Sequence, residues 1–257
     1  DVYKRQIEYR GFDQQAVVDL AKHSGVPVWN GLTTEWHPTQ MLADILTVQE
    51  NFNYDIKGKT LVFMGDCKNN VARSLMVVCS KLGMNFVGCG PKDCWMDEEL
   101  IKTCEQIAAE NGCTVKCTED VKEAATDADV IYTDVWVSMG EPDEVWAERI
   151  KHLEKFRVTK EVMAMANPDA IFLHCLPAFH DTNTTIGADI AERFGVTEME
   201  VEDEVFSQKI LGDGVAVRPS EGKLYAPCDG TIETVFETKH AVNMTSADGA
   251  ELLMHIG

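Results

Sequence analysis

Residues 59–83, "KTLVFMGDCKNNVARSLMVVCSKLG", decide the fold of this chain. A β-rich apolar run ends at Gly65 and Asp66, and the apolar residues after it follow helical spacing as far as Gly83. A glycine just past the last periodic residue is a typical helix stop. The stretch therefore predicts one buried strand followed by one helix.

The same alternation of strand and helix continues toward the C-terminus. Strand-like runs are "NFVGCG", "TVKCTED", "DVIYTDVW" and "AIFLHCLP", and the helix-like runs between and after them are "DEELIKTCEQIAAENG", "VKEAATDA", "PDEVWAERIKHLEKF" and "TTIGADIAERFG". Nearly continuous apolar strands alternating with helices predict an α/β fold, a doubly wound parallel sheet covered on both faces. Ligands of such sheets bind at the carboxyl ends of the strands, which here are residues 65–70, 89–95, 134–140 and 174–180.

The two ends of the chain follow other patterns. Residues 7–34 contain a strand and a loop, and a helix is expected to begin near Pro38 because proline is favoured in a first helical turn. After Gln208, short β-like segments separated by glycines indicate a sandwich or barrel. We interpret residues 1–6, "DVYKRQ", as a sequencing-adapter scar and exclude them from the fold.

Composition excludes several classes of protein. The chain has 257 residues, 45% of them hydrophobic, which is enough for a full core. A formal net charge of -20 without a basic run argues against nucleic acid as a partner. Nine cysteines without a CxxC pair favour a reduced, cytoplasmic protein. We find neither an apolar run of membrane-spanning length nor a signal-peptide pattern, so no membrane is expected.

Two motifs lie at predicted helix starts. "HPTQ", residues 37–40, offers an imidazole, a hydroxyl and an amide where free N–H groups favour an anion or a polarised carbonyl; the alternative is an ordinary helix start. "GDCKNN", residues 65–70, lacks the spaced glycines of a dinucleotide fingerprint. Its two asparagines suit a small polar ligand, and the alternative is an asparagine helix cap.

Two further motifs end predicted strands. In "YTDVWVSMGE", residues 132–141, Asp134 is placed to hold an ammonium group under a closing loop; the alternative is a solvated loop aspartate. In "FLHCLPAFH", residues 172–180, Cys175 follows His174. Neighbours in a strand point to opposite faces, which favours a substrate-contacting cysteine over a Cys–His nucleophile. The alternative is a buried structural cysteine.

Taken together, "VPVWNGLTTEWHPTQMLADILT", "GDCKNN", "CWM", "YTDVWVSMGE…WAERI" and "FLHCLPAFHDTNTTIG" resemble the ornithine carbamoyltransferase family from about residue 7 to 206. The "VSMG" loop distinguishes it from the aspartate and putrescine carbamoyltransferases. The resemblance implies carbamoyl transfer from carbamoyl phosphate to L-ornithine, giving citrulline and phosphate, without a metal or other cofactor. It also implies a homotrimer.

By position, the resemblance assigns roles to residues of all four motifs. The carbamoyl-phosphate site would comprise His37, Pro38, Thr39, Gln40, Cys175 and Leu176. The ornithine site would comprise Asn70, Asp134, Ser138 and Met139. Asp134 and Cys175 are also the catalytic candidates, because the attacking ammonium must first lose a proton.

Parts of the family pattern are missing. The Ser-Thr-Arg-Thr-Arg phosphate loop, a further phosphate-binding arginine and the closing segment of the family are not found in the sequence. Phosphate is the leaving group, so loss of its cationic contacts removes transition-state stabilisation. We therefore expect little or no transferase activity from this chain by itself.

From about residue 201 the chain resembles another family, the glucose-type IIA component of the bacterial sugar phosphotransferase system, through "GDGVAV.P..GKLYAP.DG", "TKHAV" and "HIG". This resemblance implies a partial β-sandwich with His255 as phosphoryl acceptor and His240 as its partner. Two unrelated strand histidines are the alternative.

The expected domains are residues 7–36, a remnant of a mostly missing carbamoyl-phosphate-binding domain, 37–206, the ornithine-binding domain, and 207–257, the phosphocarrier-like fragment. Because "DEVF", residues 203–206, fits both families, we interpret the junction as a crossover that joins two gene fragments. A natural bifunctional fusion that includes a phosphocarrier for sugar uptake, and a non-catalytic amino-acid-binding protein, are the alternatives.

Overall fold

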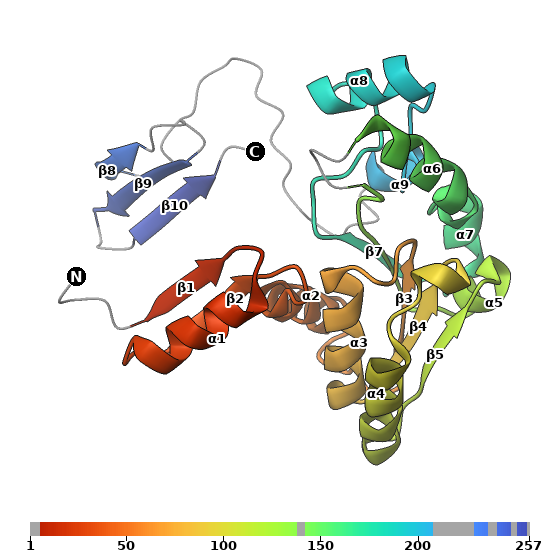
Figure 1. Ribbon diagram of the computed structural model, residues 1–257, viewed down its shortest axis with the longest axis horizontal. Coiled ribbons are helices and arrows are strands. Elements are labelled where there is room, and N and C mark those ends of the chain that lie inside the picture. Colours follow the sequence, from red (N-terminus) through yellow and green to blue (C-terminus); the bar gives the residue numbers. More distant parts are fainter. Residues whose placement is uncertain (1–5, 138–141, 208–228, 236–240, 248–250, 256–257) are drawn as a thin grey trace. The chain divides into compact units, whose positions relative to one another are not determined.

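The computed structural model describes residues 6–137, 142–207, 229–235, 241–247 and 251–255 (Figure 1). The chain divides into two compact units, residues 1–214 and 215–257, and each is considered by itself. Among the helices in the described ranges, none combines the length and apolarity needed to cross a bilayer.

The first unit is built on a five-stranded parallel sheet. Its strands are β3 (Thr60–Met64), β4 (Asn85–Cys89), β5 (Val115–Thr118), β6 (Val130–Thr133) and β7 (Ile171–His174), in the order β5-β4-β3-β6-β7. The order reverses between β3 and β6, where ligands of doubly wound sheets bind. The predicted parallel sheet is confirmed.

Helices cover both faces of this sheet (Figure 1). On one face, Leu61 and Phe63 share a core with α2 (Pro38–Asn51), α3 (Asn70–Leu82) and α4 (Glu98–Asn111). On the other, Val62 and Met64 share a core with α5 (Val121–Ala125), α6 (Asp143–Leu153), α7 (Lys160–Met165), α8 (Thr185–Phe194) and α9 (Asp203–Ser207). Two 3-10 turns complete the unit, η1 (Lys92–Cys94) and η2 (Glu154–Phe156). Apolar residues alternate between the two cores along β3, as expected of a strand that is buried on both faces.

Local chemistry fixes the ends of α2 and α3. Helix α3 starts after Asn69, whose side chain accepts a hydrogen bond from Ala72 N at 2.7 Å, and it ends at Gly83 with a φ of 77°. Helix α2 starts at Pro38, as predicted. The alternative interpretation of Asn69 as a helix cap is thus confirmed, but its amide has a second partner, described below.

Glycines let two loops meet at the carboxyl edge of the sheet. Gly65 N donates to Cys89 O at 2.9 Å, and a Cβ on Gly90 would lie 2.1 Å from Gly65 O. No side chain fits in that space. The loops after β3 and β4 are therefore held together by backbone, and this fixes one wall of the region where a ligand is expected.

Residues before α2 form a short βαβ unit. Strands β1 (Ile7–Arg10) and β2 (Val28–Leu32) pair in parallel and are connected by α1 (Gln14–His23). The Asp13 side chain caps α1 by accepting a hydrogen bond from Gln15 N. The sequence indicated the second strand and the loop but not this complete unit.

The chain that leaves β7 turns back and is fastened to the segment between α6 and α7. Val158 and Val201 form an isolated parallel bridge, in which Val158 N donates to Glu200 O at 2.9 Å. Met199 N donates to Phe179 O at 2.8 Å, and Val201 and Val205 are buried. Residues as far as 205 therefore belong to the core of the first unit.

The second unit is an antiparallel sheet of β8 (Gly230–Val235), β9 (Ala241–Ser246) and β10 (Glu251–His255), in the order β10-β9-β8. The predicted change to short β-segments is confirmed for these residues. His255 pairs with Ala241 through the backbone at the end of β10. His240 lies outside the described residues.

Candidate active site

A pocket of about 690 Å³ lies at the carboxyl ends of β3, β6 and β7. Six of the predicted site residues line it, namely His37, Gln40, Asn70, Asp134, Cys175 and Leu176. They come from the starts of α2 and α3 and from the segments after β6 and β7. The pocket is therefore at the point where the strand order reverses, as expected for a doubly wound sheet.

Asp134 is the centre of the polar contacts in this pocket. Its Oδ1 accepts hydrogen bonds from the Cys175 thiol at 3.0 Å and from Val135 N at 2.8 Å, and its Oδ2 accepts one from Asn69 Nδ2 at 3.1 Å. Burial raises the pKa of Asp134. Burial, and the adjacent Asp134 charge, also raise the pKa of Cys175, so this thiol is a hydrogen-bond donor at neutral pH. The pair suits proton transfer better than attack by a thiolate.

Asn69 was not among the predicted site residues, whereas its neighbour Asn70 was. Asn70 lines the pocket, yet its Nδ2 donates to Thr33 O at 2.7 Å and its carbonyl accepts from Ser74 Oγ at 2.6 Å. The contact between Asn69 and Asp134 joins residues 65 positions apart. Sequence spacing carries no signal for such a pair.

The start of α2 contributes a neutral histidine. Burial, followed by the positive charge of Arg10, lowers the pKa of His37. Its backbone N–H donates to Ser74 Oγ at 2.9 Å, whereas its buried Nδ1 has no hydrogen-bond partner among the described residues. A ring nitrogen left in this state is available to a ligand, since buried polar atoms are almost always paired.

Gln40 is oriented by a buried carboxylate that the sequence analysis did not single out. Gln40 Nε2 donates to Asp44 Oδ1 at 2.9 Å, and Tyr132 Oη donates to Asp44 Oδ2 at 3.0 Å. Burial raises the pKa of Asp44 from 3.8 to about 6. Asp44 follows Gln40 by four residues, so the helix itself brings the two side chains together.

His174 lies against a fully buried acid, and its donor atom is within 4.8 Å of the Cys175 sulfur, so the prediction that these strand neighbours are kept apart is not confirmed. Its Nε2 is 3.4 Å from Glu200 Oε1, and its Nδ1 accepts from Leu176 N at 2.8 Å. Glu200 Oε1 also accepts from Phe179 N at 2.6 Å. Glu200 lies in the acidic run "MEVEDEVF" and was not singled out from the sequence.

Cations line the pocket as well. They are Arg10 at the end of β1, Lys68 in the loop after β3, and Arg149 on α6. Arg149 Nη1 is 2.7 Å from Asp66 Oδ2, which ties α6 to the same loop. None of these three cations was predicted as a site residue. Lys68 and Arg149 lie in motifs that were quoted for other residues, and Arg10 lies in none of the quoted motifs.

The remaining predicted residues differ in their placement. Pro38 occupies the first turn of α2, and the Thr39 hydroxyl donates to Gly31 O at 2.9 Å, which holds α2 to β2; neither lines the pocket. Ser138 and Met139 lie outside the described residues. Leu176 has a φ of 56°, a left-handed conformation that is rare for a branched side chain and concentrated at functional sites.

Three groups of described side chains have donor atoms close enough to hold a metal ion, with all ligand atoms of a group within 4.8 Å of one another. They are Asp134, His174 and Cys175; His180, Asp181 and Asp203; and Asp93, Cys94 and His152. The first lies in the pocket already described. In the second, His180 Nδ1 is 2.8 Å from Asp203 Oδ1 and its ring stacks on Phe206 at 3.8 Å, contacts that hold the segment after β7 to α9.

The curated relatives of this chain are carbamoyltransferases. A catabolic ornithine carbamoyltransferase from Mycoplasma capricolum subsp. capripneumoniae is 57% identical over 203 residues, which are 79% of this chain and 65% of the relative. A catabolic ornithine carbamoyltransferase from Treponema denticola is 56% identical over 200 residues, which are 78% of this chain and 59% of the relative. The chain thus spans about three fifths of the length of such relatives.

Solved structures agree with the fold. The ornithine carbamoyltransferase from Pyrococcus furiosus superposes with a TM-score of 0.70 at 41% identity, covering 81% of this chain and 60% of that one. The enzyme of the same name from Gloeobacter violaceus gives 0.67 at 32% identity, covering 80% and 62%.

Sequence models of three families match. The carbamoyl-P binding domain of aspartate/ornithine carbamoyltransferase matches residues 1–50, so the prediction that this domain is mostly missing is not confirmed; the match includes residues 1–6. The EIIA 1 component of the phosphoenolpyruvate-dependent sugar phosphotransferase system matches residues 195–257. The Asp/Orn binding domain matches residues 57–211, more than half of the chain. The chain therefore belongs to the aspartate/ornithine carbamoyltransferase family.

Proposed function

We propose that this chain carries the ornithine-binding part of an enzyme that transfers the carbamoyl group of carbamoyl phosphate to L-ornithine, giving citrulline and phosphate. The observation that supports this most is the convergence of Asp134, Cys175 and His37 on one pocket at the switch point of the sheet. The relatives that bear the name ornithine carbamoyltransferase support the substrate. In this proposal residues 37–206 bind ornithine and residues 7–36 contribute to the carbamoyl-phosphate side.

Asp134 would pair with the side-chain ammonium of ornithine and accept one of its protons. A carboxyl whose pKa is raised by burial takes up a proton more readily than an exposed one. The Cys175 thiol, which donates to Asp134 Oδ1 at 3.0 Å, would fix the orientation of the carboxylate. Asn70, with Ser138 and Met139, would hold the amino-acid end of ornithine.

The neutral amine nitrogen would then attack the carbonyl carbon of carbamoyl phosphate. A C–N bond forms, the C–O bond to phosphate breaks, and phosphate leaves with the electron pair and takes the second amine proton. His37 and Gln40, at the start of α2, would contact the carbamoyl group together with Cys175 and Leu176. A polarised carbonyl oxygen near fixed donors is stabilised as negative charge develops. The nearby cations Arg10 and Lys68 suit the phosphate.

Calorimetric titration of L-ornithine into the 257-residue protein, with carbamoyl phosphate present, tests the proposal. We expect binding by the unaltered chain and at least about 30-fold weaker binding by Asp134→Asn, since truncating a buried charge partner costs about 2 kcal/mol or more. Asp127→Asn, an exposed aspartate between α5 and β6, is the matched control and should bind normally. A folded chain that does not bind ornithine, or an Asp134→Asn variant that binds like the control, contradicts the proposal.

Citrulline assays on the same samples test the expectation of little or no transferase activity that was drawn from the sequence. Citrulline formation by the purified chain at a rate typical of enzymes would overturn this expectation while leaving the assigned reaction intact. We also propose a homotrimer in the cytoplasm, as the family resemblance implies. Sedimentation of the chain would measure its own association.

As a second candidate function, we propose a phosphocarrier role for residues 207–257, supported by the EIIA 1 match. His255 would accept the phosphoryl group and His240 would assist. Phosphohistidine detection after incubation with the phosphoryl donor proteins of the system tests this, with His255→Ala expected to abolish labelling. Failure of the unaltered chain to take up label rules this second candidate out.

A further inference from the structure

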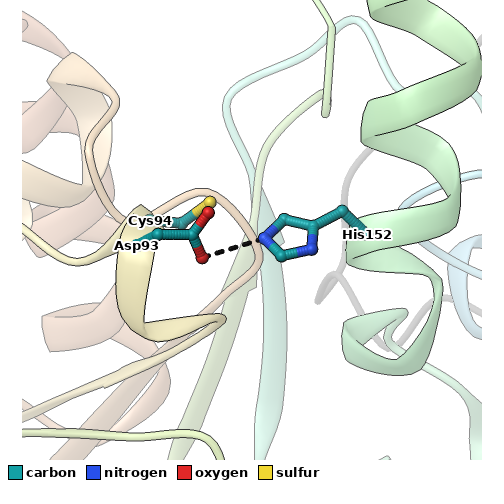
Figure 2. A group of neighbouring side chains, drawn as sticks. All are labelled: Asp93, Cys94 and His152. Atoms are coloured by element: carbon teal, nitrogen blue, oxygen red, sulfur yellow. Dashed lines mark hydrogen bonds and ion pairs between the residues drawn. The ribbon is translucent and has the colours of Figure 1, made fainter.

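Three metal-ligating side chains meet at a second pocket, of about 570 Å³, that shares Asp66, Lys68 and Arg149 with the candidate active site. Asp93 and Cys94 come from η1, after β4, and His152 comes from the last turn of α6; Figure 2 shows the aspartate and the cysteine facing the imidazole. Asp93 Oδ1 is 2.9 Å from His152 Nε2. The three ligand atoms lie within 4.8 Å of one another.

Packing fixes the two backbones that carry these side chains. Helix α6 is held by the buried residues Ile150 and Leu153, and Arg149 ties it to Asp66. The turn η1 is held by Lys92 N, which donates to Glu119 Oε1 at 3.1 Å. The ligands therefore approach each other from independently anchored elements, which lowers the ordering cost of binding an ion.

The donor set is chemically specific. Thiolate sulfur, imidazole nitrogen and carboxylate oxygen are the three ligand types that zinc takes in proteins, and three protein ligands leave a fourth position for water. Hard cations such as magnesium prefer oxygen only. The exposed side of the group provides the open position, and Glu148, one turn before His152 on α6, lines the same pocket.

The distance between two of the donor atoms fits a zinc site after a small adjustment. In a tetrahedral site with bonds of about 2.0–2.1 Å, the nitrogen and oxygen ligands lie about 3.3 Å apart. The present separation of 2.9 Å between Asp93 Oδ1 and His152 Nε2 needs to widen by a few tenths of an ångström. A hydrogen bond between these two residues explains their contact. Cys94, a free cysteine that packs against the core on the same side of the sheet as α6, supplies a third donor beside them.

We propose that Asp93, Cys94 and His152 form a binding site for a divalent transition metal ion of the zinc type, which joins α6 to η1. This site is distinct from the carbamoyl-transfer chemistry, for which the family resemblance implies no metal. It lies beside the active-site pocket rather than in it. Because α6 also carries Arg149, the bound ion braces a helix that lines both pockets.

Cobalt titration of the full chain tests the site, because Co²⁺ occupies zinc sites and gives near-ultraviolet absorption when a thiolate binds it. We expect one thiolate-bound cobalt per chain, displaced by zinc. Cys94→Ser should abolish the absorption, and Asp93→Asn and His152→Ala should each weaken binding at least about tenfold. The latter two residues are exposed, so these variants test the site even where Cys94→Ser folds poorly.

Two further variants separate this site from other donors. Cys175→Ser removes the thiol of the competing group in the active-site pocket and should retain the absorption. His23→Ala, an exposed histidine at the end of α1, is the matched control for His152. Absence of thiolate absorption in the unaltered chain, or absorption that survives Cys94→Ser and disappears in Cys175→Ser, overturns the proposal.

Discussion

Two groups of the same composition lie in the first unit and differ in burial. Each contains one aspartate, one histidine and one cysteine; they are Asp134, His174 and Cys175 in one group and Asp93, Cys94 and His152 in the other. Burial raises the pKa of Asp134, whereas a hydrogen bond from His152 lowers the pKa of the exposed Asp93. The same residue types thus give a carboxyl that takes up a proton more readily in one place and less readily in the other.

The largest loss of stability should come from removing Glu200, the buried acid next to His174. Glu200→Ala leaves Phe179 N and the His174 ring without their partner, which should lower the free energy of unfolding by about 3–5 kcal/mol. Urea unfolding measures this, with the exposed Glu192→Ala of α8 as control. A loss below about 1 kcal/mol would show that the buried group tolerates an unpaired histidine.

A second effect extends the comparison to Asp44, whose pKa is raised from 3.8 to about 6 by burial. The fold favours its protonated form, so this carboxyl weakens the fold as pH rises from about 4 to above 6. The loss is about 2–3 kcal/mol over that range. Asp44→Asn should remove this step from the pH profile of unfolding, and the exposed Asp55→Asn should keep it. An unchanged profile in Asp44→Asn would assign the step to another group.

The two cysteines should differ in reactivity. Burial, together with the nearby Asp66 and Asp93, raises the pKa of Cys94 to about 11, and burial next to Asp134 raises the pKa of Cys175 further. Since the thiolate is the reactive form, iodoacetamide should modify Cys94 at least about tenfold faster than Cys175 in the metal-free folded protein. Peptide mapping by mass spectrometry measures both rates, and equal rates would remove the distinction between the groups.

The smallest change in stability should come from altering Asp93 of the exposed group while no metal is bound. Asp93→Asn should leave the thermal midpoint of the metal-free protein unchanged, because exposed ion pairs contribute little. With zinc present, the unaltered protein should melt at a higher temperature than Asp93→Asn, since an ion that binds only the folded state stabilises it. Scanning calorimetry with and without zinc checks both expectations. A large loss without metal would give the ion pair a structural role instead.

Much of the first unit could be predicted from local pattern. The strand and helix order, the start of α2 at Pro38 and the stop of α3 at Gly83 follow from apolar spacing and terminal residues. The positions of the loops that carry the site residues could be predicted because parallel strands present their carboxyl ends at one edge of the sheet. Asp134 and Cys175 directly follow β6 and β7, and His37 directly precedes the helix start at Pro38.

Other site residues depend on contacts between distant segments. The amide that reaches Asp134 belongs to Asn69, the cap of α3, rather than to Asn70, and the contact joins residues 65 positions apart. Asp44 is buried and accepts hydrogen bonds from Gln40 and Tyr132. Glu200 is buried with Oε1 bonded to Phe179 N, whereas its Oε2 has no partner among the described residues. The periodicity of the sequence carries no information about such hydrogen-bond partners. A carboxylate in an acidic run is therefore expected to be exposed to solvent even where the fold buries it.

The bridge between Val158 and Val201 has a consequence for local opening. The segment after Cys175 is a closed loop whose far end is held by the hydrogen bonds of Val158 N to Glu200 O and Glu202 N to Val158 O. In hydrogen-exchange terms, the amides of residues 158, 179, 199 and 202 should open as one cooperative unit. Any event that frees residues 199–202 also removes the hydrogen-bond partners of Phe179, which lines the active-site pocket.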